Sequence, residues 1–349
     1  MDFFSRSFSF AESDPPVVIG EIGVNHNGDP ALAKRLVDVA VEAGVDIVKF
    51  QAFKTEKAVS RFAAMAPYQE QSGSTATNQL ELARPLELSG PQLVELKAYC
   101  DQRNMPFLCT AFDFDSLDML VDTVKITTMK VASSEVTNIP FLQQIGRHGL
   151  AAILSTGAST LEEVGTAIEA LRASGCPELI LLHCVSSYPT PADQLNLRAI
   201  QTLKREFGLP VGFSDHSEGT QAAVVSVALG AVAIEKHFTL DRSMEGPDHA
   251  ASLEPDELKS LVSEVALAHR SLGDGVKRPM PCEIENLPLI RKSLVANFSL
   301  TRGTRLSREM IEIKSPANGL HPGELDKVLG RVLACDLEED RPITWDCLV

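Results

Sequence analysis

The chain has 349 residues, 44% of them apolar and 23% charged, which suits a globular protein with a large core and excludes a disordered chain or a fibrous repeat. Asp and Glu total 47 against 32 Lys and Arg, giving a formal net charge of −15, so we expect no nucleic acid partner. The longest nearly apolar stretch, Ala222–Ile234, is shorter than the roughly 20 residues of a membrane span, and the first residues lack a signal-peptide pattern. We therefore expect a cytoplasmic protein with no membrane partner, whose scattered cysteines stay reduced.

Apolar, β-branched segments recur along the chain, and between them apolar residues return every three or four positions, the spacing of an amphipathic helix. The predicted strands are Val17–Val24, Ile47–Ala52, Pro106–Phe112, Val124–Ala132, Ala151–Thr156, Leu179–Val185, Pro210–Phe213 and Val232–His237. Candidate N-caps such as Ser89 and Thr160 precede several of the helices, and glycines such as Gly44 follow them. Strand–helix alternation of this length indicates parallel strands, and the α/β architecture that closes it is the (β/α)8 TIM barrel.

Two further segments depart from this alternation. Thr55–Glu87 is a long stretch rich in Gln, Ser, Thr and Ala, which we interpret as a lid or binding loop. The barrel pattern ends near Gly273–Gly275. We expect a catalytic barrel over residues 1–275, a linker over 276–290, and a small second domain of short strands and turns over 291–349.

In a TIM barrel the functional residues gather at the C-terminal ends of the strands. Every predicted strand carries polar residues near that end, although each buried polar group left unpaired would cost about 1–3 kcal/mol. These residues are Glu21, Asn25 and His26; Lys49 and Gln51; Thr110 and Asp113; Lys130, Ser133 and Ser134; Ser155 and Thr156; Ser186 and Tyr188; Ser214, Asp215 and His216; Glu235 and His237. A set of this size indicates one site at the barrel mouth.

Two histidines suggest a metal site. His216 and His237 are one strand–helix–strand step apart, so they belong to neighbouring strand ends. Two imidazoles with the carboxylates Asp215 and Glu235 nearby suit a divalent ion that keeps positions open for substrate oxygens and water. The alternative is a pair of hydrogen-bonded histidines without metal. A structural zinc site is not indicated, because no cysteine spacing supplies its ligands.

Two lysines suggest an anion site. Lys49 and Lys130, together with strand-end hydroxyls and the N–H groups of turns such as 155–157, could hold a small phosphorylated anion. The sequence has no Gly-x-x-x-x-Gly-Lys loop, so a nucleoside triphosphate is not indicated. Each lysine could instead form a salt bridge within the barrel, or act as a Schiff-base lysine.

Ordered motifs make the chain similar to a known family. They are Glu21–Gly28, Lys49–Gln51, Leu154–Gly157, His183–Pro191, Gly212–His216, Glu235–Thr239 and Gly246–Asp248. Together they resemble the sialic acid synthase family, which comprises bacterial N-acetylneuraminate synthases and their legionaminate and pseudaminate relatives. Lys314–Gly319 and Leu329–Ala334 resemble the small antifreeze-like (SAF) domain that ends these chains.

The resemblance implies that phosphoenolpyruvate, water and N-acetylmannosamine or a related acylamino sugar give a nonulosonic acid and phosphate. It implies a divalent ion, Mn²⁺ or Mg²⁺, on His216 and His237, with catalytic roles for His237 and for Glu21. The matching substrate positions are Lys49, Thr110, Lys130, Ser133, Ser155 and Ser214 for phosphoenolpyruvate, and Gln51, Tyr188 and Asp248 for the sugar. It also implies a domain-swapped homodimer, in which the SAF domain of one chain covers the barrel mouth of its partner.

Two positions depart from the family pattern. Ser186 stands where an asparagine is often found, and we keep it among the expected phosphate or sugar contacts. Ser315 stands where an arginine is often found, which weakens the expectation of strict N-acetylmannosamine specificity. A legionaminate or pseudaminate synthase acting on a diacetamido sugar is therefore the main alternative. A Schiff-base aldolase using Lys49 or Lys130 and a non-catalytic sugar-binding protein are the other classes considered.

Overall fold

The computed structural model describes residues 2–3, 6–8, 10–65 and 76–349. The chain forms two compact units that meet in sequence between Gly273 and Asp274. Within the described ranges, no helix is long and apolar enough to cross a membrane.

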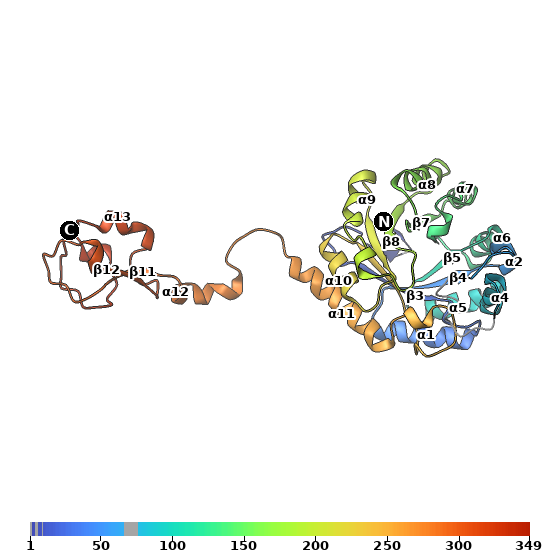
Figure 1. Ribbon diagram of the computed structural model, residues 1–349, viewed down its shortest axis with the longest axis horizontal. Coiled ribbons are helices and arrows are strands. Elements are labelled where there is room, and N and C mark those ends of the chain that lie inside the picture. Colours follow the sequence, from blue (N-terminus) through green and yellow to red (C-terminus); the bar gives the residue numbers. More distant parts are fainter. Residues whose placement is uncertain (1, 4–5, 9, 66–75) are drawn as a thin grey trace. The chain divides into compact units, whose positions relative to one another are not determined.

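The first unit is a closed barrel of parallel strands, and the predicted (β/α)8 fold is confirmed (Figure 1). The strands follow one another around the barrel in sequence order, and the last one pairs with the first. They are β3 Val17–Gly23, β4 Ile47–Ala52, β5 Phe107–Ala111, β6 Thr128–Val131, β7 Ala151–Ser155, β8 Leu179–Cys184, β9 Val211–Asp215 and β10 Ala233–His237. A short N-terminal hairpin, β1 Asp2–Phe3 with β2 Arg6–Ser7, was not predicted.

Helices surround the strands, and their ends carry the expected signals. The helices are α1 Pro30–Ala43, α5 Gly90–Gln102, α6 Phe114–Met119, α7 Ile139–Arg147, α8 Leu161–Ala173, α9 Ala199–Phe207, α10 Gln221–Ala228 and α11 Pro255–Leu272. Asp29 caps α1 by accepting from the N–H of Ala31, and Gly44 ends it in the left-handed conformation at φ 81°. Thr160 and Glu163 form a capping box at the start of α8.

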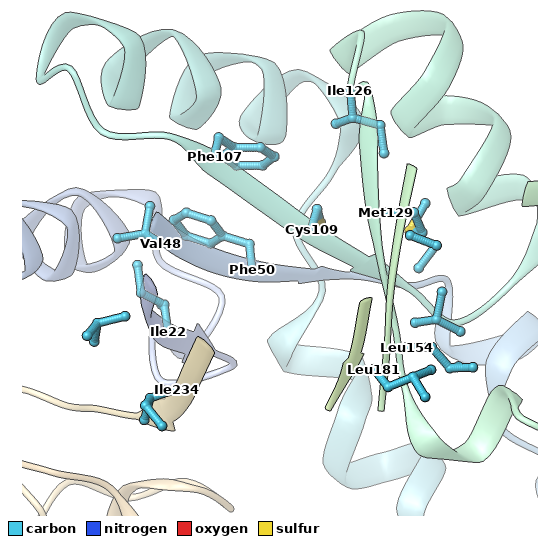
Figure 2. Close-up of a cluster of buried hydrophobic side chains, with 14 of the residues drawn as sticks. Ile22, Val48, Phe50, Phe107, Cys109, Ile126, Met129, Leu154, Leu181 and Ile234 are labelled. Carbon is cyan, nitrogen blue, oxygen red and sulfur yellow. The ribbon is translucent and has the colours of Figure 1, made fainter. Parts of the chain in front are cut away.

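The main core lies between the strands and the helices. Its side chains come from the helices and from the outward faces of the strands, and Figure 2 shows the strand residues Val48, Phe50, Phe107, Leu154 and Ile234 among them. A smaller apolar cluster fills the interior of the barrel. Burial of both clusters removes large apolar surfaces from water, and each fully buried aliphatic or aromatic side chain contributes about 1.5–3 kcal/mol.

The interior of the barrel changes from apolar to polar along each strand. Residues two apart on a strand share a face. On the inward face of β3, Ile19 is therefore followed by Glu21, and on that of β4, Ile47 is followed by Lys49. Ile153 is likewise followed by Ser155 on β7. The apolar positions belong to the interior cluster. The polar positions therefore gather at the C-terminal end, as the sequence predicted.

Two segments of the barrel unit differ from expectation. The strand predicted over Val124–Ala132 is too long, because a π-helical turn, Leu120–Val124, ends in left-handed Lys125 at φ 62° and β6 begins only at Thr128. The stretch Thr55–Glu87 contains short helices: α2 Thr55–Ala58, α4 Gln79–Ala83 and the 3-10 turn η1 Arg84–Leu86. Its residues 66–75 lie outside the described residues.

The second unit, Asp274–Val349, has its own small core. Its strands β11 Ser293–Ala296 and β12 Ile311–Lys314 pair antiparallel, and buried residues such as Leu294, Ile311 and Ile343 pack around them. The helical turns are η6 Pro281–Asn286, α12 Leu287–Ile290, η7 Arg308–Met310, η8 Pro322–Glu324, α13 Leu325–Val328 and η9 Trp345–Cys347. The segment predicted as a linker, 276–290, thus contains η6 and α12.

Candidate active site

The polar strand ends meet in one cavity of about 210 Å³, which we call the inner chamber. Its lining includes nearly all predicted site residues: Glu21, Lys49, Gln51, Thr110, Lys130, Ser133, Ser155, Ser186, Tyr188, Ser214, His216 and His237. Each strand of the barrel, or the loop that follows it, supplies at least one of them. Asp248 lies in an adjoining cavity.

Two buried lysines share a glutamate at the centre of the inner chamber. Nζ of Lys49 lies 3.1 Å from Oε2 of Glu235, and Nζ of Lys130 lies 3.5 Å from its Oε1. Burial alone would raise the pKa of Glu235, but the two ammonium groups outweigh it and hold this pKa well below its usual range. Burial lowers the pKa of Lys130, and the negative charge of Glu235 opposes this decrease. The ammonium groups are thus paired with carboxylates, as one of the alternatives predicted.

Glu21 is the second carboxylate of the inner chamber. Its Oε2 lies 3.3 Å from Nζ of Lys49, and its Oε1 accepts a hydrogen bond from Nε2 of Gln51 at 2.9 Å. Burial raises the pKa of Glu21 to about 7. The positive charge of Lys49 opposes this increase, and the negative charge of Glu235 adds to it. Such a carboxyl can give or take a proton near neutral pH.

Hydroxyl groups surround the lysines. Ser155 Oγ accepts from Nζ of Lys130 at 2.7 Å, and Ser214 Oγ donates to Glu235 at 2.8 Å. The hydroxyl of Thr110 is buried and has no hydrogen-bond partner, so it is available to a ligand oxygen. Ser133 Oγ accepts from the N–H of Gly157 at 2.9 Å.

Gly157 is required for this packing. A Cβ at Gly157 would lie 2.4 Å from Oγ of Ser186 and 2.9 Å from Oγ of Ser133. Both contacts are far inside van der Waals distance. Only glycine therefore lets the turn after β7 approach the two serines.

The two predicted metal histidines lie side by side. The ring centroids of His216 and His237 are 5.8 Å apart, and the ring of Tyr188 lies 4.1 Å from that of His216. Nδ1 of His216 is 2.8 Å from the carbonyl oxygen of Val185. That contact places the proton on Nδ1, so Nε2, which lies 3.5 Å from Oγ of Ser214, carries the electron pair.

The pKa values of both imidazoles are lowered, which favours their neutral forms near pH 7. Burial lowers the pKa of His216 to about 4. Burial, together with the neighbouring His216, lowers the pKa of His237 well below its usual value. Nδ1 of His237 is buried without a hydrogen-bond partner. Two buried imidazoles that stay neutral near pH 7, each with an electron pair to offer, fit a divalent ion with open coordination positions.

Asp215 lies near this histidine pair, since its charge acts on the pKa of His216 together with Glu235 and against the larger effect of burial, but the Asp215 carboxylate has other partners. Its carboxylate accepts from the N–H and the hydroxyl of Ser217 and forms an ion pair with Lys236 at 2.9 Å. Glu235 is engaged by the lysines. In the described part of the chain, no group of three or more His, Cys, Asp or Glu residues is placed to hold a metal, so the two imidazoles would be completed by substrate and water.

A second cavity of about 390 Å³, the outer chamber, adjoins the inner one. Gln51, Tyr188 and His237 line both chambers, and Asp248 lines the outer one. Burial raises the pKa of Asp248 to about 6, and its Oδ2 lies 3.8 Å from Nδ1 of His237. The three predicted sugar positions thus surround one space.

The other wall of the outer chamber is apolar. It is formed by Ala58, Val59, Leu82, Ala83 and Leu86, from the stretch predicted as a lid or binding loop. The acidic side chains of the chamber are Glu135 and Asp248. Apart from His237, its described lining contains no basic residue, and in particular no lysine or arginine.

Sequence reasoning did not assign Glu235 its role as the shared counter-ion of Lys49 and Lys130. The signal was present, because Glu235 is two residues before His237 on a strand and must share its inward face. The sequence also gave no partners for Asn25 and Asn27, whose contacts are made with residues more than 200 positions away.

Comparisons with known proteins agree with this geometry. Residues 36–277 match the model of the NeuB family, and residues 291–349 match the SAF domain. The chain is 41% identical to the N,N'-diacetyllegionaminic acid synthase of Campylobacter jejuni, over 94% of this chain and 98% of that protein. It is 33% identical to the human N-acetylneuraminate-9-phosphate synthase, over 94% of this chain and 91% of the relative.

A solved structure gives the same result. The N-acetylneuraminic acid (sialic acid) synthetase of Leptospira borgpetersenii, in complex with citrate, is 36% identical, with a TM-score of 0.68 over 78% of this chain and 90% of that one. The family match spans most of the barrel, and the predicted resemblance is confirmed. The chain belongs to the NeuB family of sialic acid synthases and carries a C-terminal SAF domain.

Proposed function

We propose that this chain condenses phosphoenolpyruvate with an uncharged acylamino sugar, with water, to give a nonulosonic acid and phosphate. One observation carries the proposal: an inner chamber with two buried lysines and an unpartnered hydroxyl opens directly onto a chamber of sugar size. The relatives named as synthases of legionaminic acid and of N-acetylneuraminate 9-phosphate support it. A Schiff-base aldolase is less well supported, because both lysines are engaged by carboxylates.

In this proposal the inner chamber binds phosphoenolpyruvate. Lys49 and Lys130 hold its phosphate and carboxylate, with the hydroxyls of Thr110, Ser133, Ser155 and Ser214 as further contacts. Charge-assisted hydrogen bonds of this kind contribute about 1.5–3 kcal/mol each. The buried position fixes the reactive carbon toward the opening into the outer chamber.

The remaining inner residues serve the bond-forming and water-adding steps. Held by His216 and His237, a divalent ion such as Mn²⁺ or Mg²⁺ would polarise the sugar aldehyde as a Lewis acid. After the carbon–carbon bond forms, positive charge develops at the former enol carbon, and the carboxylate of Glu21 stabilises it. Glu21 then takes a proton from the attacking water, a role that suits its pKa of about 7. Loss of phosphate completes the reaction.

The outer chamber favours a sugar without phosphate. A phosphorylated sugar would bring a dianion against Asp248 and Glu135, with no lysine or arginine in the described lining to balance it. The apolar wall at Val59, Leu82 and Leu86 suits the methyl groups of acetamido and deoxy positions. We therefore propose a diacetamido, deoxy sugar of the kind used for legionaminic acid, with N-acetylmannosamine as the second candidate.

Phosphate release from phosphoenolpyruvate tests this proposal. The purified chain is supplied with Mn²⁺ and, in separate reactions, with a 2,4-diacetamido-trideoxy hexose, N-acetylmannosamine and N-acetylmannosamine 6-phosphate. We expect the highest kcat/KM with the diacetamido sugar and the lowest with the phosphosugar. Fastest turnover of the phosphosugar would overturn the sugar assignment, and no phosphate release with any sugar would overturn the reaction.

We further propose that the enzyme acts in the cytoplasm as a homodimer, in which the SAF domain of one chain completes the site of the other. The support is in the second unit itself, where Leu289 and Ile290 are 65% and 63% exposed and Trp345 is 44% exposed. Apolar side chains of this size on a small unit indicate a surface that is covered in the assembly. Light scattering of the full chain tests it, and a monomer with full activity would contradict it.

A further inference from the structure

The turn between β3 and α1, residues 24–28, carries buried polar side chains that the proposed reaction does not use. Asn25 is 1% exposed, and its Nδ2 donates to the carbonyl oxygen of Phe238 at 2.8 Å and to Oγ of Ser252 at 2.9 Å. These partners lie 213 and 227 residues further along the chain. The turn is therefore bonded to the segment that follows β10.

Ser252 extends this connection to Asp248. The Ser252 hydroxyl, itself buried, accepts from Asn25 and donates to the carbonyl oxygen of Asp248 at 2.6 Å. Because the hydroxyl of Ser252 accepts one hydrogen bond and donates another, it links the backbone of Asp248 to the turn that follows β3, the strand that carries Glu21.

His249 makes a second connection. Its Nδ1 lies 2.6 Å from Oγ1 of Thr239, and its Nε2 lies 3.2 Å from Oδ1 of Asn27. Nδ2 of Asn27 in turn donates to the carbonyl oxygen of Glu245 at 3.0 Å. A Cβ at Gly246, which has φ 154°, would lie 2.9 Å from Oδ1 of Asn27. The segment 245–252 is thus packed closely on the turn.

The same turn contacts the opposite wall of the outer chamber. Gly28 has φ 74°, and a Cβ there would lie 2.2 Å from the carbonyl oxygen of Pro85 in η1. Leu86, the next residue of η1, lines the outer chamber, as does Val24 of the turn. The turn therefore touches both sides of the space that we assign to the sugar.

We propose that the turn 24–28 positions the walls of the outer chamber, and that Asn25 is a positioning residue that sets the place of Asp248 through Ser252. The inference rests on the proposed sugar-binding role of Asp248. Loss of the Asn25–Ser252–Asp248 connection should weaken binding of the sugar and spare phosphoenolpyruvate, because none of its hydrogen bonds reaches Lys49 or Lys130.

Ser252→Ala tests the connection, and Ser226→Ala is its matched control. Ser226 is also buried, and its hydroxyl donates to the carbonyl oxygen of Ala223 at the same 2.6 Å, but within α10. We expect Ser252→Ala to raise KM for the best sugar of the panel about tenfold, with KM for phosphoenolpyruvate unchanged. Ser226→Ala should change neither, and Ser252→Thr, which keeps a hydroxyl, should recover most of the sugar KM.

Asp248→Ala distinguishes the two ways in which this can fail. An unchanged sugar KM in Asp248→Ala would refute the sugar-binding role itself. A raised KM in Asp248→Ala together with an unchanged KM in both Ser252→Ala and Asn25→Ala would refute the positioning role alone. In the Asp248→Ala background, Ser252→Ala should add little to KM, and a further increase of about tenfold would also refute it. If Asn25→Ala does not fold, Ser252→Ala decides the question.

Discussion

Lys49 and Glu235 form a buried ion pair at the centre of the inner chamber, with 3.1 Å between Nζ and Oε2. Lys130 lies on the other carboxylate oxygen of Glu235, and Glu21 lies on the other side of Lys49. Two ammonium groups and two carboxylates thus share one small cavity, and their charges cancel when both glutamates are ionised. Phosphoenolpyruvate brings further negative charge, so its binding calls for a proton on Glu21 or for a cation nearby.

Lys49→Met should separate ligand binding from stability. We expect it to weaken phosphoenolpyruvate binding at least tenfold, because a charged contact of about 1.5–3 kcal/mol is lost. The free energy of unfolding should fall by about 3–5 kcal/mol, because Glu21 and Glu235 stay buried without this partner. Titration calorimetry and denaturant unfolding measure the two effects.

The double variant Lys49→Met/Glu21→Gln makes the separation sharper. Glu21 forms its ion pair with Lys49, whereas Glu235 keeps Lys130 in this variant, so removal of the unpaired Glu21 carboxylate should restore part of the stability and none of the affinity. Lys34→Met, which breaks a surface ion pair with Glu95 and a cation–π contact with Tyr99, is the control and should leave phosphoenolpyruvate binding intact. Equal affinity in Lys49→Met and the parent protein would remove Lys49 from the binding site.

Glu21 should govern the pH dependence of turnover. Burial raises its pKa to about 7, so the carboxylate form that accepts a proton increases as pH rises through this value. We therefore expect kcat to rise with pH and to level off above about 7. Glu21→Gln keeps shape and hydrogen bonding but removes the base, so kcat should fall by orders of magnitude and lose this rise.

Binding measurements on Glu21→Gln complete the test. The variant should keep its affinity for phosphoenolpyruvate and for Mn²⁺, because the inner chamber loses only a negative charge. Loss of Mn²⁺ binding would reassign Glu21 to the metal, and a parent-like pH profile in the variant would remove its role as a base.

The two histidines should account for metal dependence. We expect a chelator to abolish phosphate release and Mn²⁺ or Mg²⁺ to restore it, since the proposed aldehyde activation needs a Lewis acid. His216→Ala should weaken Mn²⁺ binding, measured by electron paramagnetic resonance, by more than about tenfold. His148→Ala, at a histidine paired with Asp118 on the barrel exterior, should not. Full turnover of a His216→Ala/His237→Ala chain in chelator would refute the metal site.

Most of the barrel could be predicted because its strands are continuous apolar runs with turn signals on both sides. Seven of the eight predicted strands agree with the observed ends to within about two residues, as at β3 and β4. The exception begins too early, at Val124, because Val124 and Ile126 are buried on either side of exposed Lys125, which is the alternation of a strand. These residues nevertheless form the end of a π-helical turn and the connection to β6, and local periodicity does not distinguish the two.

The sequence was enough to predict which residues gather at the site. It was not enough to predict which partner each of them contacts. Inward direction follows from the two-residue period, which places Glu21, Lys49 and His237 together. The partner of a buried charge depends on strand register and on side-chain length. Asp215 and Glu235 both precede a histidine, yet Asp215 pairs with Lys236 while Glu235 pairs with the inner lysines. The sequence motif alone placed both carboxylates near the histidines and did not separate their partners.

Ser315 should influence the choice of sugar, if the SAF domain completes the site as proposed. Its hydroxyl lies 3.4 Å from the carbonyl oxygen of Ile290, and its side chain is exposed. A serine cannot form the forked hydrogen bonds of a guanidinium. We expect Ser315→Arg to shift the ratio of kcat/KM between N-acetylmannosamine and the diacetamido sugar about tenfold, with KM for phosphoenolpyruvate unchanged. Ser299→Arg, at another exposed serine of the same unit, should leave the ratio as it is.

Truncation tests the SAF domain as a whole. The barrel forms a compact unit up to Gly273 with its own core, so a chain that ends at Gly275 should fold and unfold cooperatively. The proposed reaction passes through a charged carbon centre that an open, solvent-filled site would stabilise poorly, so an uncovered mouth should turn over slowly. We therefore expect the truncated chain to bind phosphoenolpyruvate but to lose orders of magnitude in kcat. Circular dichroism and calorimetry show whether the fold and the binding are intact, and a truncated chain with the turnover of the full one would show that the barrel alone is the enzyme.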